Sequence, residues 1–252
     1  GLADVRAATV SLCGCTVDGT LTADHGSIGR LDLSGSTITG SVSMRGATIE
    51  HELAMVGVAV GGDHNGNSVV ADDLRVGGSA LLSGGIDATI PDAASAVTSS
   101  YAGAVRLTRA SVNGNVEFVG ANLGGETGRT NALGCSLVVD GAHLGSLNLA
   151  RTRSAGCVRL IGASVDGQLS FSAANIIGTD GKGRSMVADR LDVGGSLFLR
   201  NGFRAVGEVQ LTGAAVAGQL SFAEGRDLPS VTLVGARCAR LKDYFSSWGH
   251  DA

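Results

Sequence analysis

Apolar residues recur along this chain in an 11-residue repeat. One slot of the repeat holds Gly35, Gly46 and Gly57, and another holds Ile38, Ile49 and Val60. Within one unit, Ala47 and Ile49 are two positions apart and therefore share one face of a short strand. Leu53 and Met55 form the same kind of pair in the next strand. The pattern predicts short strands separated by corners, stacked into an all-β solenoid.

A longer repeat lies on top of the 11-residue one. Three similar segments mark it: VRLTRASVNGNVEF begins at Val105, VRLIGASVDGQLSF at Val158 and VQLTGAAVAGQLSF at Val209. The additional residues between the copies fall in polar, glycine-rich stretches, which we expect to be loops on the solenoid: 61–68, 84–102, 124–134 and 178–185.

Two coil geometries fit this unit. We expect two units to form one four-sided coil of about 22 residues, because apolar pairs that recur every five to six positions leave faces too short for a broad two-sheet core. A flat two-sided coil of about 11 residues is the alternative. Coils about 4.8 Å apart would build a rod roughly 50 Å long from about ten coils, and each coil would be stabilised mainly by its neighbours.

The pattern also predicts particular core and corner positions. Glycine is expected at corners, as at Gly40 and Gly46, where a positive φ is often needed. The predicted inward-facing core residues are Val17, Leu21, Ile28, Ile38, Val42, Ile49 and Leu53.

The domain organisation expected is one solenoid over residues 1–238, followed by a C-terminal cap or tail over 239–252. The last segment changes character and holds Leu241, Tyr244, Phe245 and Trp248. In a helix these four side chains would share one face. We expect a short helix or a folded tail there to cover the open end of the rod, because an uncovered strand edge is a template for aggregation.

Composition and charge narrow the class of protein. The chain has 40 glycines, 2 prolines and 4% aromatic residues, which suits a narrow core of small aliphatic side chains. The net charge is −4 and the charges are interspersed, so no basic stripe predicts direct contact with nucleic acid. No apolar run approaches the roughly 18 residues of a membrane span, and no signal peptide is visible. A cytoplasmic location is expected.

The cysteine spacing fits neither a zinc site nor a secreted disulfide framework. We therefore expect free thiols, with a surface disulfide as the alternative. Two of the five, Cys15 and Cys238, fall on apolar slots and are expected to be buried. The other three, Cys13, Cys135 and Cys157, lie near corners and are expected to be accessible.

At the level of whole phrases, the chain resembles a known repeat. The segment VADRLDVGGSLFLRNGFRAVGEVQLTGAAVAGQLSF, from Val187 to Phe222, resembles a repeat of large actinobacterial proteins labelled membrane-associated oxidoreductase. VADDLRVGGSALLSGG from Val70 is similar to a degenerate copy. The resemblance covers the chain from about residue 8 to Trp248. In such relatives a membrane segment follows the repeats, so membrane contact is expected only through a region outside this chain, which would be a shorter homologue or a fragment.

The pair of a small and a large apolar residue on each face also resembles the pentapeptide-repeat proteins, which form right-handed quadrilateral β-helices. Such pairs are Ala47 with Ile49 and Ala163 with Val165. The resemblance implies a right-handed parallel β-helix, although a pentapeptide array advances by five positions at each step and this chain alternates steps of five and six.

Candidate catalytic chemistry is sparse. The glycine pairs at 61–62, 77–78 and 194–195 lack the full dinucleotide-binding spacing and are expected to be coil corners. The histidines lack metal-ligand spacing, although a histidine stacked on a carboxylate of the next coil would be a possible ligand pair: His25, His51, His64, His143 and His250. We predict no catalytic, cofactor-binding or metal-binding residue, and no cofactor.

One slot between the paired apolar residues is rich in hydroxyls, and its members are Thr16, Ser27, Thr37, Thr48, Ser111 and Ser164. A solvated strand is the expected interpretation. An ice-binding or ligand-binding ladder is the alternative, and it is interrupted by Ala59, His143 and Ala215.

The function expected is a scaffold without catalysis, on which loops 61–68, 84–102 and 178–185 bind a protein partner of unknown identity. Self-association by end or face packing is a further expectation. The first alternative is a mimic of DNA that acts on a DNA-binding protein such as gyrase, through stacked acids such as Asp18, Asp32 and Glu50. The second is the oxidoreductase activity that the family label implies.

Overall fold

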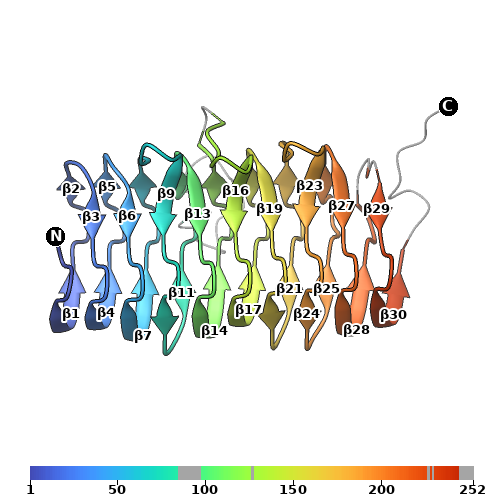
Figure 1. The fold of residues 1–252 in the computed structure, drawn as a ribbon, viewed down its shortest axis with the longest axis horizontal. Helices are drawn as coiled ribbons and strands as arrows, with labels where there is room; N and C mark the ends of the chain where they lie inside the picture. Colours follow the sequence, from blue (N-terminus) through green and yellow to red (C-terminus); the bar gives the residue numbers. More distant parts are fainter. Residues whose placement is uncertain (85–97, 126–127, 226–227, 229, 244–252) are drawn as a thin grey trace.

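The computed structural model describes residues 1–84, 98–125, 128–225, 228 and 230–243. Over these residues the chain winds into a rod of stacked coils (Figure 1). Each strand pairs in parallel with the strand one coil away. The chain therefore forms the parallel β-helix that the repeat predicts. Most of the expected loop at 84–102 lies outside the described residues, as does His250.

The strand register fixes the length of one coil. Thr16 pairs with Thr37, and Thr37 pairs in turn with Ala59. Leu21 pairs with Val42 in the same way. Each of these steps to the next coil spans two 11-residue units, to within one position. The four-sided coil is therefore correct, and the coil made of a single unit is excluded.

The strands of the described residues form three parallel sheets. The first sheet contains β1 (Arg6–Ser11), β4 (Ser27–Asp32), β7 (Thr48–Ala54), β10 (Arg75–Val76), β11 (Ala80–Leu81), β14 (Ser111–Glu117), β17 (His143–Asn148), β20 (Ser164–Val165), β21 (Leu169–Ser170), β24 (Asp192–Val193), β25 (Leu197–Phe198), β28 (Ala215–Ser221) and β30 (Arg237–Lys242). The second contains β2 (Thr16–Val17), β5 (Thr37–Ile38), β8 (Ala59–Val60), β12 (Ser100–Tyr101), β15 (Asn122–Leu123), β18 (Arg153–Ser154), β22 (Asn175–Ile176) and β26 (Arg204–Ala205). The third contains β3 (Leu21–Thr22), β6 (Val42–Ser43), β9 (Asn67–Val70), β13 (Ala104–Arg106), β16 (Cys135–Val138), β19 (Cys157–Arg159), β23 (Arg184–Val187), β27 (Glu208–Gln210) and β29 (Val231–Thr232).

The first sheet covers two sides of the rod because its strands bend. Ile28 and Leu31 of β4 are both buried, each with 1% of its surface exposed. Side chains three positions apart cannot share a face of a straight strand, so the strand turns a corner between them. We call the side of Ile28 face 1 and the side of Leu31 face 2; the second and third sheets form faces 3 and 4.

Glycine occupies the corners for two different reasons. At Gly46, between face 4 and face 1, φ is +60°, a conformation that side chains disfavour. At Gly40 φ is not positive, but a β-carbon would lie 2.6 Å from the carbonyl carbon of Gly19 in the preceding coil. The expected positive φ is therefore confirmed at Gly46 and wrong at Gly40. The glycine pairs at 77–78 and 194–195 lie at bends between strands, as expected.

One continuous apolar core fills the rod. Six of the seven predicted core residues are buried: Leu21, Ile28, Ile38, Val42, Ile49 and Leu53. The seventh, Val17, packs against the core but stays partly exposed, because β2 is the first strand of its sheet and has a neighbour on one side only.

Two cysteines lie in the terminal coils of the rod and are more exposed than the sequence pattern predicts. Cys15 and Cys238 were expected to be buried, but both are exposed. Cys15 lies in the first coil and Cys238 in β30, the last strand that pairs with the rod, so each has a coil on one side only.

The C-terminal helix expected from residue 239 is wrong over the residues that the structure describes there. β30 (Arg237–Lys242) pairs in parallel with β28, so the solenoid extends beyond residue 238. Leu241 is 54% exposed. The remaining expected cap residues Tyr244, Phe245 and Trp248 lie outside the described residues.

Candidate functional site

Three loops of one design project from the edge between faces 3 and 4, and we call residues 63–67, 131–135 and 180–184 the edge loops. In the first, Asp63 Oδ1 accepts hydrogen bonds from the backbone N–H groups of Asn65 and Asn67, at 2.9 and 2.8 Å. The Asp63 N–H in turn donates to the Asn67 carbonyl oxygen. The side chain thereby satisfies the backbone groups of a tight turn.

The other two edge loops repeat these contacts. Asn131 Oδ1 accepts from the N–H groups of Leu133 and Cys135, at 2.9 and 3.1 Å. Asp180 Oδ1 accepts from those of Lys182 and Arg184, at 2.9 and 3.0 Å. Each edge loop therefore has an Asp or Asn four positions before the first residue of the face 4 strand that follows it.

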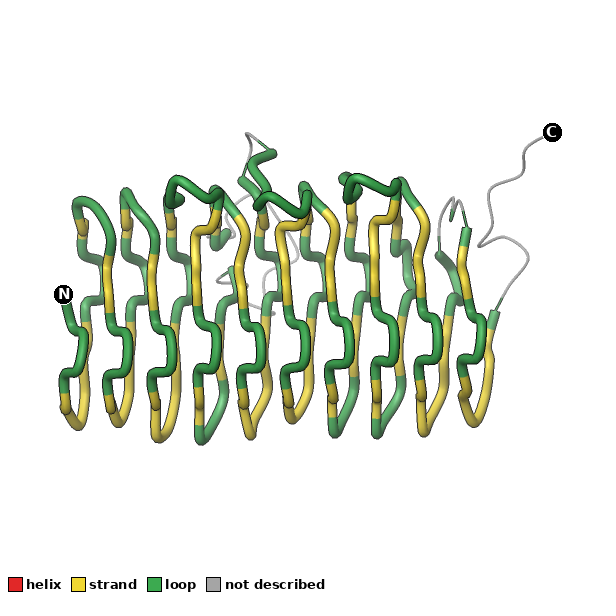
Figure 2. The backbone as a smooth tube through the Cα atoms, in the orientation of Figure 1, coloured by secondary structure: helices red, strands yellow, loops and turns green. Residues whose placement is uncertain are grey.

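The edge loops occur in every second coil and contact one another. A β-carbon built on Gly66 would lie 2.3 Å from the carbonyl oxygen of Thr130, and one on Gly134 would lie 3.1 Å from the Cα of Asp180. In the coils between them, short corners such as Ala155-Gly156 connect the same two faces. The edge loops thus form a continuous row along one edge, at the top of the rod in Figure 2.

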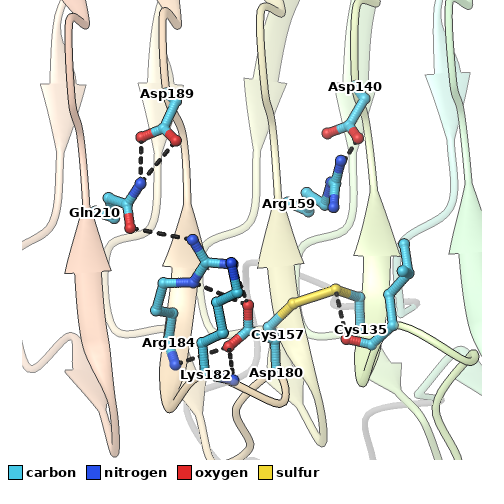
Figure 3. A network of polar contacts seen from close by, with 10 residues as sticks. Cys135, Asp140, Cys157, Arg159, Asp180, Lys182, Arg184, Asp189 and Gln210 are labelled. Atoms are coloured by element: carbon cyan, nitrogen blue, oxygen red, sulfur yellow. Dashed lines mark hydrogen bonds and ion pairs between the residues drawn. A yellow bond between two sulfur atoms is a disulfide. The ribbon is translucent and has the colours of Figure 1, made fainter.

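A disulfide joins the middle edge loop to the next coil. Cys135 and Cys157 are register partners in β16 and β19, and their sulfur atoms are bonded (Figure 3). Both residues are buried, so the expectation of free, accessible thiols was wrong for this pair. It is confirmed for Cys13, which is free and exposed. The sequence did contain a signal for this disulfide. Cys135 and Cys157 are 22 residues apart, which is the length of one coil.

A polar network continues from the third edge loop across face 4 (Figure 3). The Arg184 guanidinium contacts Asp180 Oδ2 at 2.6 Å and donates to Gln210 Oε1 at 3.2 Å. Gln210 Nε2 donates to the Asp189 carboxylate at 2.7 Å. Burial raises the pKa of Asp180, but the hydrogen bonds from Arg184 and from the backbone of Lys182 outweigh burial and hold the pKa below its usual value.

Two aspartates at the end of face 4 are paired with cations of the next coil. Asp72 lies 2.8 Å from Arg106, and Asp140 lies 2.5 Å from Arg159. The acids considered for DNA mimicry do not form one column. Asp32 ends β4 on face 2, whereas Asp18 follows β2 on face 3, and Glu50 lies near the bend of β7.

A polar groove of about 500 Å³ lies on face 2, over β14, β17 and β21. Its polar side chains are Asn115, Glu117, Ser146, Asn148, Gln168 and Ser170. They come from outward positions of three neighbouring coils, as the register of Asn115 with Ser146 and of Asn148 with Ser170 shows. The sequence did not reveal this groove, because the insertion between β14 and β17 hides the alignment of their outward residues.

One histidine does lie beside a carboxylate of the next coil, as considered from the sequence. His143 Nε2 lies 3.3 Å from Asp166 Oδ2 of the next coil. Both side chains are more than half exposed, and within the described part of the chain no group of three metal-ligating side chains gathers. The geometry therefore does not build a metal site from this pair.

The hydroxyl-rich slot divides between two faces. Thr16 and Thr37 pair on face 3, whereas Ser27 and Thr48 pair on face 1. Because each coil contains two units, alternate members of the slot point in different directions. The residues therefore do not form the single ladder that an ice-binding surface would need.

The comparisons add no relative from which a function could be transferred. No protein-family model, curated protein or solved structure matches the chain at a significant level. Within the ranges that the structure describes, no helix is long and apolar enough to cross a membrane.

Proposed function

We propose that the chain is a binding scaffold without catalysis, and that the edge formed by the loops holds a protein partner. The proposal rests on the position of the large apolar side chains that are exposed to solvent. Three of them lie along this edge: Leu133 is 51% exposed, Ile177 is 37% exposed and Val206 is 58% exposed. The other two exposed examples among the described residues, Val234 and Leu241, lie in the last coil.

The arrangement suits recognition of a protein surface. Leu133 belongs to the middle edge loop, Ile177 leads into the third, and Val206 lies at the short corner of the following coil. With coils about 4.8 Å apart, the three span roughly 15 Å along the rod. Apolar residues surrounded by polar ones are typical of protein interfaces, and the hydrogen-bonded edge loops lose little conformational entropy on binding.

The proposal is tested with a photo-crosslinking amino acid at position 182, in the full chain expressed in its native host. We expect a specific crosslinked protein that is lost in the triple variant Leu133→Ser, Ile177→Ser, Val206→Ser. The matched control is Val234→Ser with Leu241→Ser, which removes exposed apolar side chains elsewhere and should keep the crosslink. Equal crosslinking from position 164 on face 1, or no loss in the triple variant, would contradict the proposal.

The alternatives have less support. DNA mimicry requires an uninterrupted acidic face, but Asp72 and Asp140 of face 4 are partnered by arginines. Oxidoreductase activity rests on the resemblance to a labelled family, and stoichiometric flavin absorbance of the purified protein would favour it. Neither alternative explains the apolar edge.

The disulfide bears on location. Disulfides persist mainly in oxidising compartments, so the Cys135–Cys157 bond supports a location outside a reducing cytoplasm, contrary to the expectation from the cysteine spacing. Mass spectrometry of the protein isolated from its native host under thiol-trapping conditions tests this point, since the reduced pair would carry two labels.

A further inference from the structure

We infer that the groove on face 2 binds a neutral oligosaccharide chain laid across the coils. The groove is separate from the apolar edge used in the proposed function. Its volume of about 500 Å³ lies in the range of small-ligand sites, roughly 300–1,000 Å³.

The polar side chains of the groove form a regular grid. Each of β14, β17 and the segment around β21 contributes two outward residues that are two positions apart, which places them about 6.6 Å apart along the strand. Neighbouring strands add a spacing of about 4.8 Å across the coils. Six polar side chains therefore face the groove as a two-by-three array on a rigid sheet.

The chemistry of the array selects the ligand class. The six comprise three amides, two hydroxyls and one carboxylate: Asn115, Asn148, Gln168, Ser146, Ser170 and Glu117. Amides and hydroxyls can both donate and accept hydrogen bonds, which complements a ligand with many uncharged hydroxyls. No cation is among the described lining residues, so an anionic ligand would meet Glu117 without compensation.

Much of this hydrogen-bonding capacity is unused by the protein. Asn148 Oδ1 accepts from the N–H of Ala150, and Ser170 Oγ bonds with Ser172 Oγ. Among the described residues, the side chains of Asn115, Glu117, Ser146 and Gln168 have no hydrogen-bond partner in the protein. Their polar atoms are available to a ligand that replaces bound water.

An aromatic side chain continues the same column. Phe198 is the register partner of Ser170 in the next coil, and the guanidinium of Arg200 lies 3.9 Å from its ring centroid. The guanidinium covers one face of the ring, so the polar array alone provides the contacts from which the ligand class is inferred.

The groove is equipped for binding rather than hydrolysis. Glycoside hydrolysis ordinarily requires two carboxyl groups placed on either side of the bond. Glu117 is the single carboxylate among the described lining residues. We therefore expect a bound oligosaccharide to be released unchanged.

The test is affinity electrophoresis of the full chain through gels that contain dextran, galactomannan or xyloglucan, all neutral polysaccharides. Polygalacturonate serves as the charged probe. We expect retardation by at least one neutral polymer and none by polygalacturonate. The polymer should keep its length distribution after prolonged incubation with the protein.

Variants of the groove test whether the polymer binds there. They should fold normally, because the side chains that they remove make no hydrogen bonds to the rest of the described protein. Asn115→Ala and Gln168→Ala should each raise the dissociation constant at least tenfold. Asn175→Ala, an outward residue of face 3, is the matched control and should leave it unchanged. The inference is overturned if no neutral polymer retards the protein, if polygalacturonate or an added peptide is bound instead, or if the groove variants bind as the parent does. The edge variant Leu133→Ser should bind the polymer normally, which separates this result from that of the protein-partner test.

Discussion

The imidazole ring of His25 lies over the α-carbon of Gly46, one coil further along the rod. A β-carbon on Gly46 would come 2.8 Å from Nδ1 and 3.1 Å from Cε1 of His25. Both residues occupy the corner between faces 4 and 1 with positive φ, +57° and +60°. A side chain at this corner thus uses the space that glycine leaves in the following coil. Arg109 and Gly141 repeat the arrangement, since a β-carbon on Gly141 would lie 3.7 Å from Arg109 Cγ.

This relationship predicts a coupled effect on stability. Gly162→Ala, where φ is +63° and a β-carbon meets no atom within 4 Å, should cost about 1–2 kcal/mol from backbone conformation alone. Gly46→Ala should cost more, because the His25 ring must also move. In urea denaturation, the double variant His25→Ala, Gly46→Ala should lose that additional cost. If Gly46→Ala and Gly162→Ala are equally destabilising, the contact has no energetic role.

The disulfide predicts a redox-dependent stability. Reducing Cys135–Cys157, or replacing both by serine, should lower the free energy of unfolding by about 3 kcal/mol, the value expected for closing a loop of this length. The measurement is the urea midpoint with and without reductant. Cys13→Ser, at an exposed free thiol, should leave the response to reductant unchanged. A parent protein insensitive to reductant would contradict the prediction.

The third edge loop predicts an acid-dependent stability. Because hydrogen bonds hold the pKa of Asp180 in the folded protein below its ordinary value of 3.8, the charged contacts stabilise the fold fully above that value. The contribution is lost as the pH falls through the folded pKa. Asp180→Asn should reduce stability by about 1–2 kcal/mol at pH 7 and flatten the decline between pH 5 and pH 2.

Asparagine is a suitable replacement there because Asn131 already accepts the same two backbone hydrogen bonds in the middle edge loop. The turn should therefore persist while the charge on Arg184 loses its partner. Asp192→Asn, at an exposed position of β24, is the control. An unchanged pH profile in Asp180→Asn would show that other groups cause the acid sensitivity.

A buried charge in the core should disrupt the rod. Ile49 is 1% exposed, and Ile49→Asp should cost at least about 3 kcal/mol, because an unpaired buried carboxylate is strongly unfavourable. Val234→Asp, at a site that is 70% exposed, should change stability by less than about 0.5 kcal/mol. Thermal unfolding followed by circular dichroism measures both variants. Equal melting temperatures would show that the inward assignment is wrong.

The periodicity was sufficient to predict the fold because inward positions are fixed by apolar spacing. Ile38 and Ile49 both point into the core although they lie on different sides of the rod. The same spacing could not show which outward residues are neighbours, since that depends on the number of units in a coil. Members of one slot, such as Thr37 and Thr48, therefore lie on different faces.

The candidate sites were harder to predict because insertions interrupt the register. Asn115 and Ser146 are adjacent in the sheet, but the insertion between them means that their separation in the sequence is no whole number of repeat units. At the two ends the pattern failed for another reason. Cys15 and Cys238 occupy slots that are buried elsewhere, but each lies in a terminal coil without a second neighbour. Sequence spacing alone does not contain that information.

The covalent bond between Cys135 and Cys157 has a consequence for the rod under tension. Pulled from its two ends, a solenoid would unspool, and each released coil of about 22 residues would lengthen the chain by roughly 75 Å. The bond closes 22 residues, one full coil, into a ring. That coil cannot extend while the sulfur atoms are joined, so an extension trace of the oxidised protein should be shorter by one such step than that of the reduced protein.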